Sequence, residues 1–213
     1  MISILDYGAG NLRSVENTLG AIGAEYELIR TAEQLRAATK VILPGVGHFG
    51  QMMRALDAMN VRAGILDTIR AGVPFLGICL GLQALFTSSE EAPEERGLGI
   101  FDGVVKRFQG DMRIPHMGWN QVEHAPRATS RAPLHGPLHE PSRLLRGIDQ
   151  PPYLYFANSY YCPMVPATTG ACHYGVDFTA ILERENICGV QFHPEKSGGL
   201  GLRIVRNFVE GWA

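Results

Sequence analysis

The sequence predicts an α/β fold: a mostly parallel central sheet flanked by helices, with additional antiparallel strands in the second half of the chain. Two observations support this. In the first half, short apolar runs alternate with segments whose apolar residues recur every three or four positions. This alternation is typical of a parallel sheet that is covered on both faces. In the second half, strand-like runs follow one another with few helical segments between them.

The composition limits the class of protein. A chain of 213 residues fits one domain, which we expect to span residues 1–213. With 46% apolar and 19% charged residues it has enough apolar side chains for a sizeable core. A formal net charge of -2 gives no electrostatic reason to expect a nucleic acid or an anionic membrane as partner. The first residues lack the basic segment of a signal peptide. We expect a cytoplasmic protein.

The elements of the first half can be taken in order. Residues 11–23 form a helix whose apolar face carries Leu12, Val15, Leu19 and Ile22. Thr31 and Gln34 have the spacing of a capping box that opens a helix over 31–38. A long helical stretch after residue 50 is broken or bent near Asn60 and Gly64, and a further helix begins at 80–86. The expected strands are 1–7, 25–29, 40–45 and 73–78.

The second half is expected to be rich in strands, which cover residues 98–108, 153–161, 171–185 and 187–193. Residues 125–142 are rich in Pro, Ser and His without periodicity, which predicts an exposed loop. The last segment, 199–212, returns to a helix with Leu202, Val205 and Val209 on one side.

Cys79 is the first candidate for chemistry. It stands between Gly77 and Gly81 where a buried strand gives way to a helix, the arrangement of a nucleophile elbow. The partial positive charge of a helix N-terminus favours a thiolate there. The alternative is a buried cysteine that only packs. The other cysteines are Cys162, Cys172 and Cys188; the four lack zinc-like spacing and are expected to be reduced thiols.

His193 is the candidate base. It ends an apolar run, and Glu195 follows two residues later, so in an extended chain both side chains point the same way. The alternative is a strand-end histidine without chemistry. Four other histidines have no obvious orienting acid at short range: His48, His116, His124 and His173. His135 and His139 lie in the predicted loop and are expected to be solvated.

The glycine-rich segment 43–50, LPGVGHFG, follows a strand, and its backbone N–H groups could face a developing oxyanion. A phosphate-binding loop is the alternative use of such a composition. The segment lacks the Gly-Lys-Ser/Thr of a P-loop, and GAGN at 8–11 lacks the third glycine of a dinucleotide fingerprint.

Taken in order, PGVGHFG, GICLGLQ and HPEKS resemble the class I glutamine amidotransferase family over nearly the whole chain. The resemblance implies the flavodoxin-like fold of that family and a glutaminase without metal or organic cofactor. It implies Cys79 as nucleophile, His193 as general base and acid, and Glu195 as the orienting carboxylate. It further implies an oxyanion hole from the backbone N–H groups of Val46 and Leu80. Gly47, Gln83, Ser159 and Tyr160 match positions that hold glutamine.

Within the family, DYGAGNLRSV, IPHMGWN, YFANSYY and HPEKS resemble the glutaminase subunits of imidazole glycerol phosphate synthase, a hydrolase/lyase complex of histidine biosynthesis. This implies a heterodimer with a (β/α)₈-barrel cyclase that receives ammonia, and Asn11, Arg13 and Lys196 on the partner-facing surface. Asn158 stands where the family usually has histidine.

Three alternatives remain open at this stage. The first is a glutaminase of another synthase, such as the one that makes pyridoxal 5'-phosphate. The second is a cysteine peptidase or chaperone-like hydrolase on a similar scaffold. The third is a non-enzymatic regulatory subunit, in which Cys79 is only part of the core.

Overall fold

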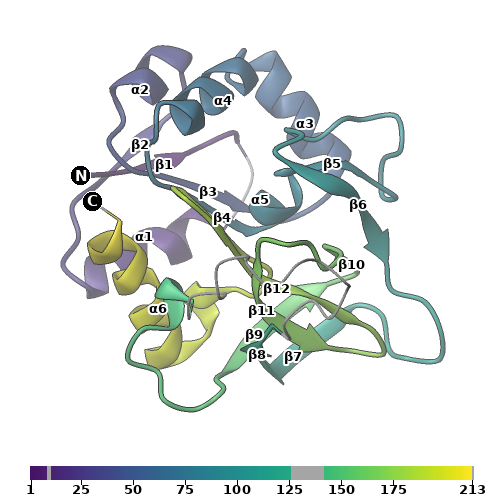
Figure 1. Ribbon diagram of the computed structural model, residues 1–213. Helices are drawn as coiled ribbons and strands as arrows, with labels where there is room; N and C mark the ends of the chain where they lie inside the picture. Colours follow the sequence, from purple (N-terminus) through teal and green to yellow (C-terminus); the bar gives the residue numbers. More distant parts are fainter. Residues whose placement is uncertain (9–10, 126–141, 213) are drawn as a thin grey trace, which may run out of the picture.

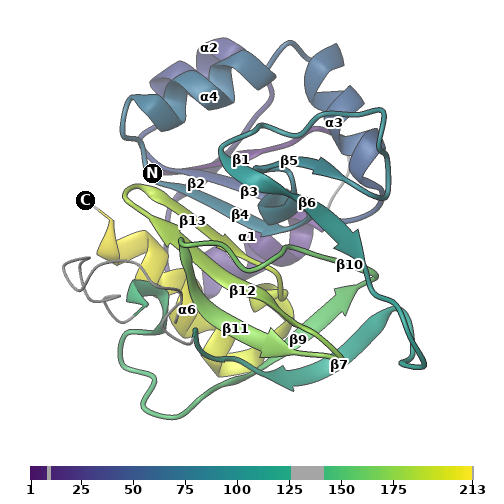
Figure 2. The ribbon, with the colours of Figure 1, turned by 45° about the vertical axis from the view of Figure 1, so that its right-hand side comes forward.

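The computed structural model describes residues 1–8, 11–125 and 142–212. In this part of the chain an eight-stranded sheet has the order β2-β1-β3-β4-β13-β12-β11-β8 (Figures 1 and 2). The strands are β1 (Ile2–Leu5), β2 (Tyr26–Ile29), β3 (Val41–Gly45), β4 (Phe75–Cys79), β8 (Glu123–His124), β11 (Thr168–His173), β12 (Asp177–Arg184) and β13 (Ile187–Val190). The first five strands of that order pair in parallel, and the remaining pairs are antiparallel. The predicted α/β class with a mostly parallel sheet is therefore confirmed.

Two small sheets accompany the central one. In the first, β6 (Phe101–Arg107) lies between β5 (Phe86–Ser89) and β10 (Tyr160–Tyr161). In the second, β7 (His116–Gln121) pairs antiparallel with β9 (Tyr153–Asn158), and His116 is opposite Asn158. The strand β7 was not predicted, because its sequence HMGWNQ mixes polar and apolar residues without a clean alternation.

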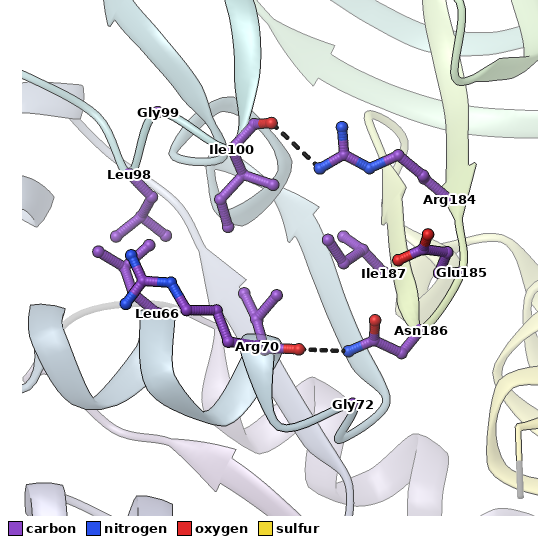
Figure 3. Close-up of a pocket in the computed structure, with 11 residues that line it drawn as sticks. Leu66, Arg70, Gly72, Leu98, Gly99, Ile100, Arg184, Glu185, Asn186 and Ile187 are labelled. Carbon is purple, nitrogen blue, oxygen red and sulfur yellow. Dashed lines mark hydrogen bonds between the residues drawn. The ribbon is translucent and has the colours of Figure 1, made fainter.

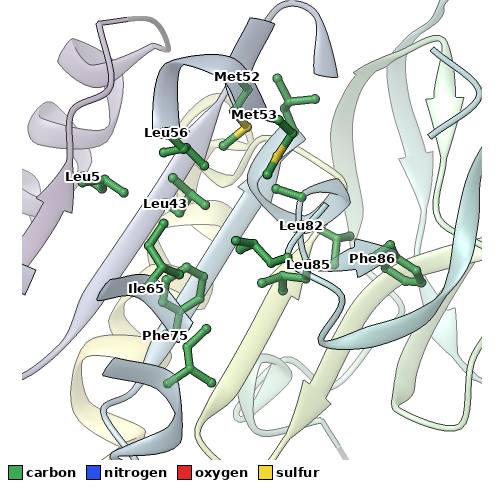
Figure 4. Packing of buried hydrophobic residues seen from close by; sticks show 14 of the residues in the cluster. Leu5, Leu43, Met52, Met53, Leu56, Ile65, Phe75, Leu82, Leu85 and Phe86 are labelled. Atoms are coloured by element: carbon green, nitrogen blue, oxygen red, sulfur yellow. The ribbon is translucent and has the colours of Figure 1, made fainter. Parts of the chain in front are cut away.

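Helices cover both faces of the central sheet (Figures 1 and 2). One face packs against α2 (Ala32–Ala37), α3 (Phe49–Ala58) and α4 (Arg62–Arg70), and the other against α1 (Leu12–Ala21) and α6 (Gly198–Gly211). The strands alternate accordingly: Leu43 faces the first core, which Figure 4 shows with Met52, Leu56 and Ile65, whereas Ile42 faces the second. Each fully buried side chain of this size contributes about 1.5–3 kcal/mol to folding.

Local predictions for the helices of the first half are largely correct. Gln34 N donates to Thr31 Oγ1 at 3.2 Å and Thr31 N donates to Gln34 Oε1 at 3.1 Å, so the capping box is present. Asn60 lies between α3 and α4 with φ 55°, which breaks the helical stretch as predicted. Gly64 does not bend the chain, because it lies inside α4, where the missing side chain lets Ala32 of α2 approach.

Two helix predictions are wrong in part, one in its length and one in its buried face. The helix predicted over 80–86 is only α5 (Leu80–Gln83), and Phe86 already begins β5. Where the helix ends, the Ala84 carbonyl accepts from Leu98 N at 2.7 Å in place of a following helical turn. In α6 the predicted Val205 is buried and Val209 packs partly against the core, but Leu202 does not belong to this face, which is completed by Ile204 and Phe208.

The predicted loop at 125–142 lies, apart from its two end residues, outside the described residues. Two short 3₁₀ helices complete the described chain: η1 (Arg143–Leu145) and η2 (Pro194–Lys196). None of the helices in the described residues is long and apolar enough to span a bilayer.

Candidate active site

The site lies where three neighbouring parallel strands end. Gly45 at the end of β3 pairs with Cys79 at the end of β4, and Val190 at the end of β13 pairs with Ile78. Adjacent parallel strands bring their carboxyl ends to one edge of the sheet, which is where ligands bind in open α/β sheets. The three segments singled out in the sequence therefore meet at this edge.

Cys79 occupies the sharp strand-to-helix turn that the sequence predicted. Its backbone has φ 53° and ψ −104°, a conformation that is strained for any residue with a side chain. The flanking glycines are required by close packing: a Cβ on Gly77 would lie 2.6 Å from the Gly81 carbonyl oxygen, and one on Gly81 would collide with the Leu43 carbonyl. Because α5 has only four residues, its dipole favours the thiolate less than the predicted longer helix would.

His193 and Glu195 form a buried pair. His193 Nδ1 lies 2.8 Å from Glu195 Oε1, and both side chains are 3% exposed. The predicted contact is present, but not through an extended chain: Pro194 starts the η2 turn, which curls Glu195 back onto the imidazole. Backbone bonds hold the turn in place, since His193 N donates to the Tyr155 carbonyl at 2.8 Å.

The charge state of His193 depends on Cys79. Burial by itself lowers the pKa of His193, but the charge and hydrogen bonding of Cys79, together with Glu195, outweigh it and raise that pKa to about 10. Since Nδ1 faces Glu195, Nε2 is the ring nitrogen that can form the hydrogen bond with Cys79. The imidazole is thus arranged to carry a proton beside the sulfur of Cys79.

The other three cysteines lack such a partner. In the described part of the chain all four thiols are buried and free of disulfides, as expected. Burial raises the pKa of Cys172 to about 12 and the pKa values of Cys162 and Cys188 well above the ordinary range. These three therefore stay protonated and unreactive near neutral pH.

A cavity of about 260 Å³ opens in front of Cys79 and His193. All six residues expected to bind substrate line it: Val46, Gly47, Leu80, Gln83, Ser159 and Tyr160. Glu195 does not line the cavity and stands behind His193. The sequence reasoning missed Glu91, which also lines the cavity and whose Oε2 accepts from Phe49 N at 2.7 Å at the start of α3. Its place in the acidic stretch SSEEAP, just after the nucleophile segment, was the available signal.

The sequence profile of the family "Glutamine amidotransferase class-I" matches residues 3–212. The chain belongs to the class I glutamine amidotransferase family. The protein named imidazole glycerol phosphate synthase subunit HisH from Methanothermobacter thermautotrophicus is 44% identical over 211 residues, 99% of this chain and 98% of that one. The protein of the same name from Desulfitobacterium hafniense strain Y51 is 42% identical over 210 residues, 98% of this chain and 93% of that one.

Solved structures of low sequence identity share the fold of this amidotransferase. A structure described as "Crystal structure of glutamine amidotransferase" aligns with a TM-score of 0.72 at 18% identity, covering 98% of this chain and 97% of that one. "Structure of PurLQS from Thermotoga maritima" aligns with a TM-score of 0.73 at 15% identity, covering 100% and 98%. At such identities the likeness concerns the fold alone.

The three residues expected on a partner-facing surface differ in how exposed they are. Arg13 and Lys196 are exposed. Asn11 is half-buried, and its Nδ2 lies 3.5 Å from Glu195 Oε1, so it contacts the carboxylate of the buried pair.

An exposed apolar surface on the β7–β9 sheet was not predicted. Met117, Trp119 and Tyr153 are 62%, 55% and 55% exposed. Trp119 meets Tyr155 edge to face, and the Lys196 ammonium lies 5.8 Å from the Tyr155 ring. We call these five residues the β7–β9 face. The two large apolar residues Met117 and Trp119, two positions apart, were the signal that could have revealed it.

The remaining histidines of the amidotransferase have other environments. His116 is stacked between Tyr174 and Phe156, and burial lowers its pKa to about 4, which keeps the ring neutral. His48 caps α3 by accepting from Gly50 N. His173 has an acid partner after all, because the turn between β11 and β12 brings Asp177 within 2.6 Å of its Nδ1 at an exposed position. His135 and His139 lie outside the described residues.

A larger cavity of about 410 Å³ lies away from this site (Figure 3). It is lined by Gly72 and Asn186, which precede β4 and β13, so it opens at the opposite ends of the strands that carry Cys79 and lead to His193. The described residues that line it include neither cysteine nor histidine. Size alone therefore does not locate the chemistry of this amidotransferase.

Proposed function

We propose that this class I glutamine amidotransferase is the glutaminase subunit of an imidazole glycerol phosphate synthase. It hydrolyses L-glutamine to glutamate and ammonia and passes the ammonia to a (β/α)₈-barrel cyclase subunit, which makes imidazole glycerol phosphate and AICAR in histidine biosynthesis. The 42–44% identity to proteins named HisH over nearly the full chain supports the assignment. The observation that carries the chemistry is Cys79 beside a buried His193–Glu195 pair at a small cavity.

The reaction begins with the Cys79 thiolate, which attacks the side-chain amide carbon of glutamine and forms a carbon–sulfur bond. The oxyanion accepts hydrogen bonds from the backbone N–H groups of Val46 and Leu80; one such donor contributes about 3–4 kcal/mol in comparable sites. The His193 imidazolium gives its proton to the departing nitrogen, the carbon–nitrogen bond breaks, and ammonia leaves a thioester and a neutral imidazole.

Hydrolysis then restores the enzyme. Neutral His193 takes a proton from water while the hydroxide adds to the thioester carbon. The carbon–sulfur bond breaks, sulfur leaves as thiolate, and glutamic acid forms and loses its proton to water. Glu195 accepts from His193 Nδ1 throughout and so holds the imidazole in the tautomer that both steps need.

Recognition of glutamine uses the walls of the cavity. Its volume of about 260 Å³ suits a single amino acid. Gly47, Gln83, Ser159 and Tyr160 hold the substrate, and the Glu91 carboxylate supplies the negative charge that an α-ammonium group requires. We assign this role to Glu91 because it is the one carboxylate among the described residues that line the cavity.

The partner subunit docks beside the cavity. The β7–β9 face lies beside the cavity, since Ala157 and Asn158 of β9 and Pro115, which precedes β7, line the cavity. An exposed apolar surface with the Lys196 ammonium beside the Tyr155 ring is the kind of surface that binds another protein. A partner seated there would receive ammonia without its passing through solvent.

The experiment replaces Cys79 by alanine in the complex with the cyclase of the same organism. We expect glutamine-dependent turnover to fall by a thousandfold or more, on the order seen when a nucleophile is removed, while turnover with added ammonium salt is retained. Cys172→Ala is the matched control, since it removes a buried thiol of β11 away from the cavity and should keep glutaminase activity. Glutamine-dependent turnover that survives Cys79→Ala would contradict the mechanism.

A further inference from the structure

A second polar side chain contacts the nucleophilic sulfur. Gln191 follows β13, two residues before His193, and is completely buried. Its Nε2 donates to Cys79 Sγ at 3.6 Å, within the range of hydrogen bonds to sulfur. Its Oε1 accepts from Gln83 Nε2 at 3.2 Å. The amide thus stands between the reacting atom and a residue of the substrate cavity.

The orientation of this amide is fixed by its neighbours. The Tyr160 carbonyl accepts from Gln83 Nε2 at 3.0 Å, so the Gln83 amide must turn its nitrogen toward Tyr160 and Gln191. Gln191 must then present its oxygen to Gln83. This leaves its nitrogen, and not its oxygen, facing the sulfur. A flipped Gln191 would set two donors against each other at Gln83 and a carbonyl oxygen against the thiolate.

The Tyr160 carbonyl is itself held in place. Asn158 Nδ2 donates to it at 2.9 Å, so the carbonyl accepts two amide hydrogen bonds at the junction of β9 and β10. The chain of hydrogen bonds that orients the Gln191 amide therefore begins at the Tyr160 backbone carbonyl and ends at the Cys79 sulfur. No step of it depends on a proton that titrates.

We propose that Gln191 is a second hydrogen-bond donor to the Cys79 sulfur, oriented by Gln83, and that it stabilises the thiolate. The proposal rests on the function proposed above, in which that thiolate is the nucleophile. Sulfur is negative before the attack and again when it leaves the thioester. His193 changes its protonation during both steps, whereas the Gln191 amide keeps its proton and can stabilise the anion each time.

A packing role alone does not account for Gln191. It follows an apolar strand, and a buried amide is unfavourable unless its groups are hydrogen-bonded, whereas methionine would fill a similar volume at no such cost. Among the described residues, the reacting sulfur is the one hydrogen-bond acceptor of Gln191 Nε2, which is a specific arrangement.

The test measures the rate of Cys79 alkylation by chloroacetamide against pH in the full chain, with the modified peptide identified by mass spectrometry. In Gln191→Met the alkylation rate at the acid end of the pH profile should fall about tenfold. The rising acid limb of that profile should move about one pH unit to higher pH, as expected for the loss of a hydrogen bond to a charged group. The alkaline plateau should not fall. Gln191→Glu, which puts an acceptor in place of the donor, should displace the limb further in the same direction.

Asn207→Leu is the matched control, because Asn207 is a buried amide of α6 that donates to the Leu144 and Arg146 carbonyls and is not among the described residues that line the cavity. Its alkylation profile should coincide with that of the unaltered protein. If Gln191→Met has an unchanged acid limb, or loses only the plateau, the proposal is wrong. The readout needs no glutamine, so inactivity toward glutamine in the unaltered complex would overturn the function and leave this result standing.

A measurement on the unaltered sequence covers the case in which the variants do not fold. The side-chain amide protons of Gln191, followed by NMR, should shift with pH along the same profile as Cys79 alkylation, because the sulfur they face gains its charge over that range. The dependence should vanish in Cys79→Ala. An amide resonance of Gln191 that is independent of pH in the unaltered protein would overturn the proposal.

Discussion

At the scale of single residues, Cys79 determines the charge of His193. His193 is 2% exposed, and burial alone would leave it neutral near pH 7. The negative charge of Cys79 reverses that tendency, and Glu195 adds to the reversal. The imidazolium is therefore a property of the pair, and removal of the sulfur should release the proton at lower pH.

The first prediction follows from this sign. In the unaltered protein the pKa of about 10 keeps His193 protonated at pH 8. In Cys79→Ala the charge and the hydrogen bond of Cys79 disappear while the burial of His193 remains. The pKa of His193 should therefore fall, and a larger fraction of the rings should be neutral at pH 8 than in the unaltered protein. Histidine side-chain NMR with ¹⁵N labelling measures this. Cys172→Ala should leave the His193 titration unaltered. An identical titration in Cys79→Ala and the unaltered protein would show that the sulfur does not hold the proton.

At the scale of elements, β7 and β9 perform two tasks with opposite faces. His116 and Phe156 point inward into an aromatic cluster, whereas Met117 and Trp119 point outward, because successive residues of a strand alternate between faces. The inner face thereby fixes the strands that border the cavity. The outer face stays available for a second subunit.

The prediction for this element concerns Trp119. Trp119→Ala should weaken binding of the cyclase subunit about tenfold or more, since large aromatic side chains at the centre of an interface carry much of its binding energy. Titration calorimetry with the cyclase of the same organism measures the affinity. Tyr26→Ala is the control: Tyr26 is also an exposed aromatic residue, 37% exposed, but lies on β2 at the far edge of the central sheet. If both variants weaken the affinity for the cyclase equally, or if neither variant changes it, the β7–β9 face is not the docking surface.

At the scale of the whole molecule, the features that could be predicted from the sequence are those that depend on local sequence patterns. Periodicity predicted the parallel strands, cap spacing predicted the Thr31 capping box, and flanking glycines predicted the turn at Cys79. Because β3, β4 and β13 are adjacent, the glycine-rich segment, the Cys79 segment and the His193 segment meet at one edge of the sheet. The length of α5 could not be predicted, because it ends on a hydrogen bond from Leu98. The same holds for Gln191, whose partner Gln83 lies 108 positions away. Contacts that distant leave no local signal.

The whole chain also raises the question of how many units fold together. We propose that residues 1–213 form one domain. Leu154 and Phe156 of β9 belong to the same buried cluster as Ile204 and Phe208 of α6, so the small β7–β9 sheet shares a core with the central one. Elements that share a core lose its burial together and should unfold together.

The two tryptophans permit a direct test of this proposal. Trp119 reports on β7, and Trp212 reports on the end of α6, where it packs against Phe208 and the Arg143 guanidinium. Trp119→Phe and Trp212→Phe each leave one fluorescent reporter. In each variant the thermal transition followed by fluorescence should have the same midpoint as the transition followed by far-UV circular dichroism, because loss of the shared core unfolds both sheets at once. If Trp119 reports a transition several degrees below the loss of secondary structure, the β7–β9 sheet unfolds as a separate unit and the single-domain proposal is wrong.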